Sequence, residues 1–214
     1  MNKLRVGITG QDGFVGQYLY NTLGLSPEEF ERIDFNRDDF DNQTKLNDFV
    51  AQCDVIVHLA AMNRHPDPEV IYNTNIDLVK KIILALETCQ SKAHVLFSSS
   101  SQEENENLYG KSKKEGRELL TKWADKSEGK FTGMVIPNVF GPFGKPYYNS
   151  FIATFSHQLS HNEQPKIEKD TDVKLIYIGD LIDVIISEIV KETGENILVV
   201  PHTDQKKVSE ILAL

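Results

Sequence analysis

The sequence predicts an α/β protein built on a doubly wound parallel sheet, with a small second region toward its C-terminus. Short apolar runs alternate with longer segments of helical periodicity through the first 137 residues. The runs are continuously apolar, which is typical of parallel strands covered by helices on both faces. A length of 214 residues and an apolar content of 40% suit one such core. We therefore expect a larger unit over residues 1–137 and a smaller region over residues 138–214, interleaved with the same core.

The elements follow from the periodicity of each segment. Buried strands are expected at the largely apolar runs of residues 4–9, 54–59, 93–97 and 131–136, and a second, weaker strand at residues 32–35. Helices are expected where apolar residues recur three and four apart, at residues 15–23, 46–51, 69–89 and 109–126. Residues 138–149 carry two glycines and two prolines and are predicted to form a loop. Beyond it we expect helices at 150–161 and 180–191, strands near 174–178 and 196–200, and a helix starting at Val208.

Composition excludes several classes of protein. The formal net charge of −9 and the lack of a basic stripe argue against nucleic-acid binding. No run of about 18 apolar residues is present, so no membrane span is predicted. The two cysteines and the dispersed histidines match no metal-binding spacing. Because no apolar signal segment precedes the first strand, a cytoplasmic location is expected.

A glycine-rich turn joins the first expected strand to the first expected helix. Gly10, Gly13 and Gly16 have the spacing G-x-x-G-x-x-G. Glycines let the backbone approach a pyrophosphate, and the helix N-terminus supplies free amides and a positive dipole. This context predicts a dinucleotide-binding turn, and hence a Rossmann-type sheet.

Two residues at the end of the second strand bear on the choice of dinucleotide. Asp34 lies where a ribose-binding carboxylate is expected, about 20 residues after the turn, and its presence favours NAD(H). Arg37 instead suits a 2′-phosphate, because its guanidinium binds phosphate strongly. We favour NADP(H) on the strength of Arg37, and NAD(H) stays open.

Ser100, Tyr109 and Lys113 form the candidate catalytic group. Tyr109 and Lys113 have the spacing Y-x-x-x-K at the start of an expected helix, which places them on one face. A neighbouring ammonium stabilises a phenolate and so lowers the pKa of a tyrosine. Ser100 ends the serine run that closes the fourth strand, and its hydroxyl is expected to polarise the same carbonyl oxygen.

Together these motifs resemble the extended branch of the short-chain dehydrogenase/reductases, the NAD-dependent epimerase/dehydratase family. Other segments are similar as well: residues 57–61 resemble the cofactor segment of the third strand, residues 137–142 the nicotinamide and substrate loop, and residues 177–180 a late strand-to-helix junction. The resemblance implies cofactor binding by Gly10, Gly13, Phe14, Val15, Gly16, Asp34, Arg37, Asp39, Phe40, Leu59, Ala60, Ala61, Asn75, Ser98, Pro137 and Val139.

Residues 58–64, the short gap between Ser100 and Tyr109, and residues 145–155 are similar to the reductase half of the CapF family of capsular polysaccharide enzymes. This resemblance implies NADPH-dependent reduction of the C4 ketone of a UDP-linked 2-acetamido-2,6-dideoxy-hexos-4-ulose. Tyr109 would donate the proton, Lys113 would lower its pKa and hold the nicotinamide ribose, and Ser100 would bind the ketone. It also implies a following cupin domain, and sugar-nucleotide binding by Asn63, Arg64, Asn138, Lys145, Tyr148 and Asn149.

Two departures from the family pattern are present. Val135 stands where the extended branch commonly has an arginine, so the anchoring of the substrate loop is expected to differ. The acidic stretch at residues 102–107 is predicted to be a solvated lid or turn without a role.

Rival functions stay open at this point. An NAD-dependent 4-epimerase or 4,6-dehydratase is one, although no acidic residue lies directly beside Ser100 and Glu103 is the nearest. A non-catalytic NAD(P)-binding module is another, and the intact Tyr109–Lys113 pair argues against it. A homodimer is expected through the helices at residues 69–89 and 109–126, because these often pair in the family.

Overall fold

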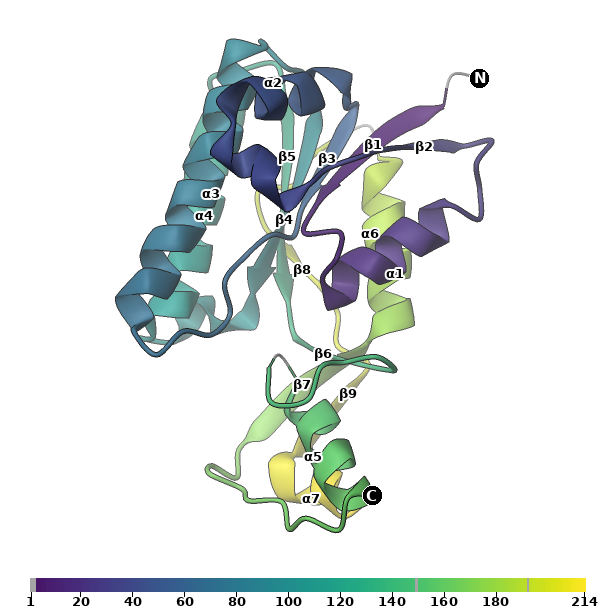
Figure 1. Cartoon of the computed structure of the whole chain (residues 1–214), viewed down its shortest axis with the longest axis vertical. Helices are drawn as coiled ribbons and strands as arrows, with labels where there is room; N and C mark the ends of the chain where they lie inside the picture. Colours follow the sequence, from purple (N-terminus) through teal and green to yellow (C-terminus); the bar gives the residue numbers. More distant parts are fainter. Residues whose placement is uncertain (1–2, 149, 192) are drawn as a thin grey trace.

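The computed structural model describes residues 3–148, 150–191 and 193–214. Its main layer is a parallel sheet of six strands in the order β2-β1-β3-β4-β5-β8 (Figure 1). The strands are β1 (Leu4–Thr9), β2 (Phe30–Ile33), β3 (Val55–His58), β4 (His94–Ser100), β5 (Lys130–Ile136) and β8 (Leu198–Val199). Helices cover both faces, so the predicted doubly wound α/β fold is confirmed.

The two faces of the sheet carry different helices. One face packs against α1 (Phe14–Leu23) and α6 (Ile178–Ile189), and the other against α2 (Gln43–Gln52), α3 (Pro68–Thr88) and α4 (Leu108–Ala124) (Figure 1). Strand side chains alternate between the two cores, as the period of two requires. In β4, for example, Leu96 belongs to the first core, whereas Val95 and Phe97 belong to the second.

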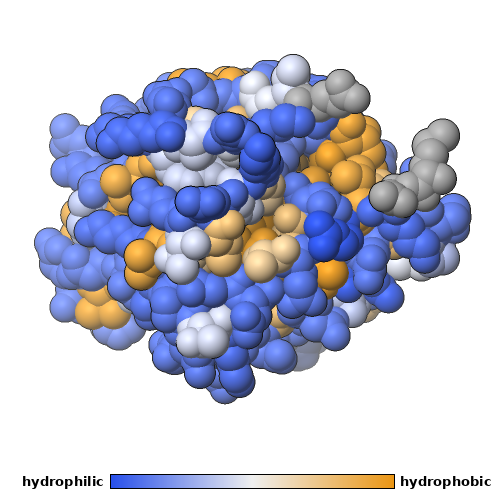
Figure 2. All heavy atoms as spheres, turned by 90° about the horizontal axis from the view of Figure 1, so that it is seen from above, coloured by the Kyte–Doolittle hydropathy of each residue, from blue (hydrophilic) through white to orange (hydrophobic). Residues whose placement is uncertain are grey.

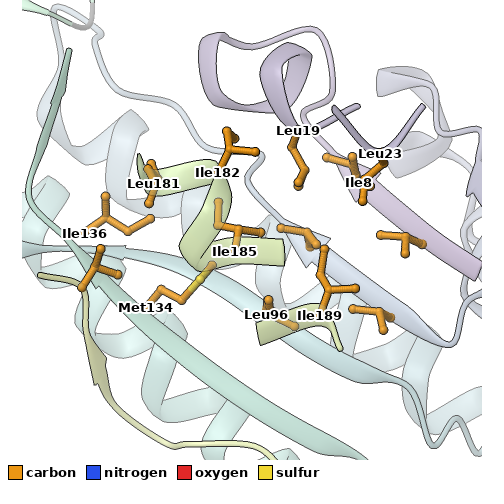
Figure 3. Packing of buried hydrophobic residues seen from close by; sticks show 14 of the residues in the cluster. Ile8, Leu19, Leu23, Leu96, Met134, Ile136, Leu181, Ile182, Ile185 and Ile189 are labelled. Atoms are coloured by element: carbon orange, nitrogen blue, oxygen red, sulfur yellow. The ribbon is translucent and has the colours of Figure 1, made fainter. Parts of the chain in front are cut away.

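Branched aliphatic residues dominate the core between the sheet and α6. Ile182, Ile185 and Ile189 of α6 are buried against strand residues such as Leu96 and Met134 (Figure 3). Burial of each such side chain contributes about 1.5–3 kcal/mol to folding. This apolar stripe explains why a helix from the C-terminal third of the chain returns to cover the six-stranded sheet.

The second region lies beyond the carboxyl ends of the main strands (Figure 1). It contains a three-stranded sheet in the order β6-β7-β9, formed by β6 (Asn138–Phe140), β7 (Asp172–Tyr177) and β9 (Asp204–Lys207). Two helices, α5 (Phe151–Ser160) and α7 (Val208–Leu212), accompany it. Hydrogen bonds join the two regions: the Tyr18 hydroxyl donates to the carbonyl of Pro142 (3.1 Å), and Arg64 Nη1 donates to the carbonyl of Tyr147 (2.7 Å).

The structure corrects several predicted boundaries. The first residues of the expected loop, Asn138–Phe140, form strand β6 instead, because they pair with β7 before the first glycine is reached. The expected strand near residues 174–178 ends one residue earlier, since Ile178 begins α6. Two short 3₁₀ helices, η1 (Arg37–Asp41) and η2 (Ser101–Glu104), were not predicted. They are too short to show an apolar period.

The end of the molecule opposite the second region is covered mostly by hydrophilic residues, with smaller apolar patches between them (Figure 2). No helix within the described ranges combines the length and the apolar character that crossing a membrane requires.

Candidate cofactor and catalytic site

The candidate site lies at the carboxyl ends of the main strands, between β1 and β3. The chain runs from β1 outward to β2 and then crosses back to β3 on the other side of β1. Such a reversal of strand order leaves a crevice outside the sheet, and ligands of α/β proteins bind there. The glycine turn follows β1, residues 59–64 follow β3, and Ser100 ends β4.

The backbone of the glycine turn leaves no space for side chains at two of its three glycines. Gly10 has φ +78°, and a Cβ there would lie 2.8 Å from the amide nitrogen of Ala60. A Cβ on Gly16 would lie 2.7 Å from Gln11 Cα and closer still to the Gly10 carbonyl. Gly13 is the N-cap of α1 and no side chain caps the helix, so its first amides are free for an anion. This cradle fits a pyrophosphate.

The neighbouring aromatic and apolar residues of the turn serve packing. Phe14 and Val15, expected at the cofactor, pack their side chains against the first core. Contact of these two residues with a cofactor would therefore come from their main-chain amides.

Thr9 and His58 join the ends of β1 and β3 beneath this cradle. Thr9 Oγ1 lies 2.6 Å from His58 Nδ1 and 3.4 Å from the amide nitrogen of Ala60. Burial and the Lys113 ammonium lower the pKa of His58 to about 3. His58 is thus a neutral core residue that fixes the segment Leu59, Ala60 and Ala61.

The end of β2 places Asp34 and Arg37 in solvent. Both side chains are exposed, and neither makes an ion pair within the described parts of the chain. Both are therefore available to a ribose or its phosphate. Asp39, in contrast, accepts a hydrogen bond from the Asn36 amide (2.8 Å) in a capping box of η1. Phe40 is buried, with its ring centroid 5.0 Å from that of Phe35.

Three consecutive serines at the end of β4 make three different contacts. The Ser98 hydroxyl donates to the carbonyl of His58 (3.2 Å), and the Ser98 carbonyl accepts from Lys113 Nζ (2.9 Å). The Ser99 hydroxyl donates to the Glu103 carboxylate. Ser100 Oγ accepts from the amide of Gln102 (3.2 Å), which leaves its own proton free for a substrate oxygen.

Tyr109 and Lys113 lie one turn apart near the start of α4. Asn107 caps this helix by accepting from the Gly110 amide (2.7 Å). Lys113 Nζ lies 5.8 Å from the centroid of the Tyr109 ring and 5.1 Å from that of Phe97. The structure therefore brings Ser100, Tyr109 and Lys113 to one edge of the sheet, as the spacing predicts.

Burial shifts the pKa of both groups. It lowers the pKa of the Lys113 ammonium to about 8, against an opposing effect of the Glu103 carboxylate. It raises the pKa of the Tyr109 phenol to about 12. The structure therefore contradicts the expected lowering of the Tyr109 pKa, because loss of hydration disfavours the phenolate. A neutral phenol is the form that donates a proton.

The acidic stretch after Ser100 is not wholly solvated, contrary to the prediction. Glu103 turns inward and makes a bidentate ion pair with Arg117 of α4, with Arg117 Nη2 2.7 Å from Glu103 Oε2. Their side chains are only 9% and 10% exposed. Glu104 and Glu106 remain exposed. One signal for this pair is visible in the sequence, since Tyr109, Lys113 and Arg117 recur every four residues along one face of α4.

Asn75 of α3 acts within the chain. Its Oδ1 accepts from the Met62 amide (2.7 Å), and its Nδ2 donates to the Met62 carbonyl (3.2 Å) and to Ser112 Oγ (3.1 Å). It is 5% exposed. The Asn75 amide thus holds the segment after β3 against α4, next to Lys113, and a direct contact with the cofactor stays a prediction.

The residues expected to bind substrate lie on two segments, one after β3 and one in and after β6. Asn63 and Arg64 are exposed after β3, while Lys145 and Tyr148 follow β6, with Lys145 Nζ 5.2 Å from the Tyr148 ring centroid. Asn138 Nδ2 lies 3.4 Å from the Lys174 carbonyl. Two expected cofactor residues lie nearby: buried Pro137 directly follows β5, and half-buried Val139 lies in β6. Asn149 falls outside the described residues.

Comparison with known proteins identifies the family. Residues 6–199 match the model of the NAD dependent epimerase/dehydratase family. The chain belongs to this family. The family expected from the glycine turn, the serine run and the Y-x-x-x-K spacing is thus confirmed.

Named relatives are similar over nearly the whole chain. A UDP-2-acetamido-2,6-beta-L-arabino-hexul-4-ose reductase from Pseudomonas aeruginosa is 31% identical over 180 residues, which are 84% of this chain and 48% of the relative. The capsular polysaccharide assembling protein CapF from Staphylococcus aureus is 27% identical, with a TM-score of 0.79 over 98% of this chain and 56% of CapF. The chain therefore spans about half the length of both relatives.

A second solved structure supports the fold alone. RMD from Pseudomonas aeruginosa, complexed with NADPH, has a TM-score of 0.85 at 18% identity and covers 99% of this chain and 80% of its own.

Proposed function

We propose that the protein is an NADPH-dependent reductase of the C4 ketone of a UDP-linked 2-acetamido-2,6-dideoxy-hexos-4-ulose. The observation that carries the proposal is the position of Lys113, which lies beside the Tyr109 ring and bonds the end of β4 that carries Ser100, at the sheet edge that also carries the glycine turn. The 31% identity to a reductase of a UDP-linked 4-ketosugar supports the choice of substrate. The exposed Arg37 supports NADPH over NADH.

Different residues of this chain bind the cofactor, bind the ketone and transfer the proton. The free amides at the start of α1 hold the pyrophosphate, and Arg37 binds the 2′-phosphate. The bound nicotinamide supplies the hydride. Ser100 donates a hydrogen bond to the ketone oxygen, and the neutral Tyr109 phenol gives that oxygen its proton. The Lys113 ammonium, held by the Ser98 carbonyl at 2.9 Å, then stabilises the Tyr109 phenolate and holds the nicotinamide ribose.

The pKa of Lys113 gives the proposal a pH dependence. With a pKa of about 8, the ammonium keeps its charge at neutral pH and loses it above pH 8. Turnover is therefore expected to fall on the basic side of pH 8, where the phenolate loses its stabilising cation. Measurement of kcat from pH 6 to pH 10 checks this.

A dehydratase is less well supported by the geometry. Such an enzyme needs a free acidic group beside the serine that holds the ketone. Glu103, the nearest acidic residue along the chain, already pairs with Arg117 and accepts a hydrogen bond from the Ser99 hydroxyl. Because the Glu103 carboxylate is already occupied by these two partners, the geometry favours simple reduction over elimination of water.

A panel of UDP-linked 4-ketosugars, offered with NADPH and with NADH, tests the proposal, with the product identified by NMR. Tyr109→Phe should lower turnover about 10²- to 10⁴-fold while NADPH still binds, because it removes only the donated proton. Tyr20→Phe is the matched control, since its ring lies under Arg32 away from this site. Full activity in Tyr109→Phe would exclude Tyr109 as the acid. Copurified NAD⁺ without consumption of NADPH would favour an epimerase.

The proposal extends to assembly and cellular setting. We propose a homodimer through α3 and α4, whose outer faces line an open groove of about 740 Å³ that includes Tyr72, Leu108 and Leu119. Light scattering of the purified protein tests this. We also propose that the protein acts in the cytoplasm, in the synthesis of capsular or other surface polysaccharides, together with a cupin epimerase domain. The resemblance to the CapF family supports the last two points.

A further inference from the structure

The Glu103–Arg117 ion pair lies beside the candidate catalytic residues, yet it has no part in the chemistry proposed above. Glu103 follows Ser100 by three residues, and Arg117 follows Lys113 by four residues on the same face of α4. Arg117 Nε lies 2.9 Å from Glu103 Oε1 and 3.2 Å from Oε2, and Nη2 lies 2.7 Å from Oε2. The pair therefore connects the segment after Ser100 with the helix that carries Lys113.

The surrounding residues are shaped to hold this pair. The Ser99 hydroxyl of β4 donates to Glu103, so three elements meet at one carboxylate. Gly133 of β5 leaves the space for Arg117, because a Cβ there would lie 2.6 Å from Arg117 Cδ. Gly110 lets η2 lie against α4, because a Cβ there would lie 2.8 Å from the carbonyl carbon of Gln102.

We propose that Glu103 and Arg117 are positioning residues that hold Ser100 and Lys113 in register for ketone reduction. This proposal rests on the proposed function. Ser99 lies between Ser98 and Ser100 in the chain. The Ser98 carbonyl accepts a hydrogen bond from the Lys113 ammonium. Because Glu103 of η2 bonds Ser99 and is itself held by Arg117 of α4, the pair holds the end of β4 against the helix that carries Tyr109 and Lys113. A buried ion pair adds little net stability compared with apolar residues, which favours a role in geometry.

The pair also places a guanidinium near the end of β4, opposite an uncharged position of β5. Val135 of β5 lies opposite Ser99 in the β4–β5 register and is uncharged. The guanidinium in this part of the site comes from Arg117 of α4, through Glu103 and Ser99.

The charges around Lys113 show how the pair would act on it. β3 brings the neutral His58, η2 brings Glu103, and α4 itself brings Tyr109 and Arg117. On α3, the uncharged Asn75 bonds the adjacent Ser112. Glu103 raises the pKa of Lys113, opposing the effect of burial. Removing the Glu103 charge is therefore expected to lower the Lys113 pKa and to shift the basic limb of the pH–rate profile to lower pH.

The test compares Glu103→Gln with Glu104→Gln. Glu104 is the next residue of η2 and is exposed, so its variant removes the same charge without touching the pair. Two measurements are made on each: kcat and the KM for NADPH from pH 6 to pH 10, and the Lys113 pKa by NMR of ¹³C-labelled lysine. Arg117→Lys, which keeps the charge and loses the bidentate geometry, is the second variant, and circular dichroism reports on folding.

For Glu103→Gln we expect kcat to fall about tenfold or more, a KM for NADPH within about twofold, and a lower Lys113 pKa. Glu104→Gln should match the unmodified protein, and Arg117→Lys should lower kcat while largely keeping the Lys113 pKa. If Glu103→Gln folds and matches Glu104→Gln in both measurements, the positioning role is wrong. If Glu103→Gln does not fold, unchanged kcat in Arg117→Lys overturns it. If the unmodified protein reduces no ketosugar, the proposed function fails, and the NMR titration alone decides the positioning role.

Discussion

Gly16→Ala tests the cradle on which cofactor binding depends. The added Cβ would lie 2.7 Å from Gln11 Cα and 2.9 Å from the Gln11 carbonyl carbon, and nearer still to the Gly10 carbonyl. All three are backbone atoms, so the turn itself has to move by roughly half an ångström or more, at a cost of about 1–3 kcal/mol. Because this turn positions the free amides of α1, the distortion is expected to weaken the complex with NADPH. We expect the Kd for NADPH to rise roughly 5- to 150-fold.

A fluorescence titration with NADPH measures this change. Gly24→Ala is the matched control at the other end of α1, where the backbone is helical (φ −68°) and the new Cβ would meet only the flexible end of Arg32 within 3.0 Å. Thermal unfolding of both variants separates lost binding from lost folding. If Gly16→Ala binds NADPH as tightly as Gly24→Ala does, the glycine turn is not the pyrophosphate site, and the reasoning is wrong.

Three further predictions concern specificity and stability. Arg37→Ala should lower the affinity for NADPH about 10- to 100-fold, with little effect on the affinity for NADH, because a charged hydrogen bond to the 2′-phosphate is lost. Arg32→Ala is the control. Equal losses of affinity for both cofactors would contradict the role of Arg37. Leu96→Ala should lower the free energy of unfolding by about 2–5 kcal/mol in urea denaturation, because Leu96 is fully buried, whereas Leu25→Ala, at an 81% exposed residue, should change it little. Burial lowers the pKa of His94 to about 4, below its unfolded value of about 6.5, so the unfolded chain binds a proton that the native chain does not. Stability should therefore fall by up to about 1.4 kcal/mol per pH unit as the pH drops from 6.5 toward 4, and His94→Gln should lessen this acid sensitivity in thermal melts, whereas the exposed His202→Gln should not.

The sequence was sufficient for the sheet and the catalytic edge because both depend on local pattern. Continuous apolar runs specify buried parallel strands, and the Y-x-x-x-K spacing alone places Tyr109 and Lys113 one helical turn apart. The carboxyl ends of parallel strands share one edge, so Ser100 and the glycine turn had to lie near each other once the strand order was known.

The parts that were missed depend on contacts between distant residues. Glu103 lies in a run of exposed acidic residues, and only the packing of η2 against α4 turns it toward Arg117. Strand β6 forms because its pairing partners in β7, 37 residues later in the chain, lie beside it. The pKa of Tyr109 follows its burial, which no local spacing reports.

The two hydrogen bonds that join the second region to the sheet have a consequence for how substrate preference can evolve. Tyr18 and Arg64 both bond main-chain carbonyls, those of Pro142 and Tyr147, and make no use of the side chains there. Every residue offers such a carbonyl, so the loop between them can exchange side chains without losing these two attachments. Under the proposed function, substitutions confined to this loop could therefore change the sugar preference while the nucleotide-binding half stays unaltered.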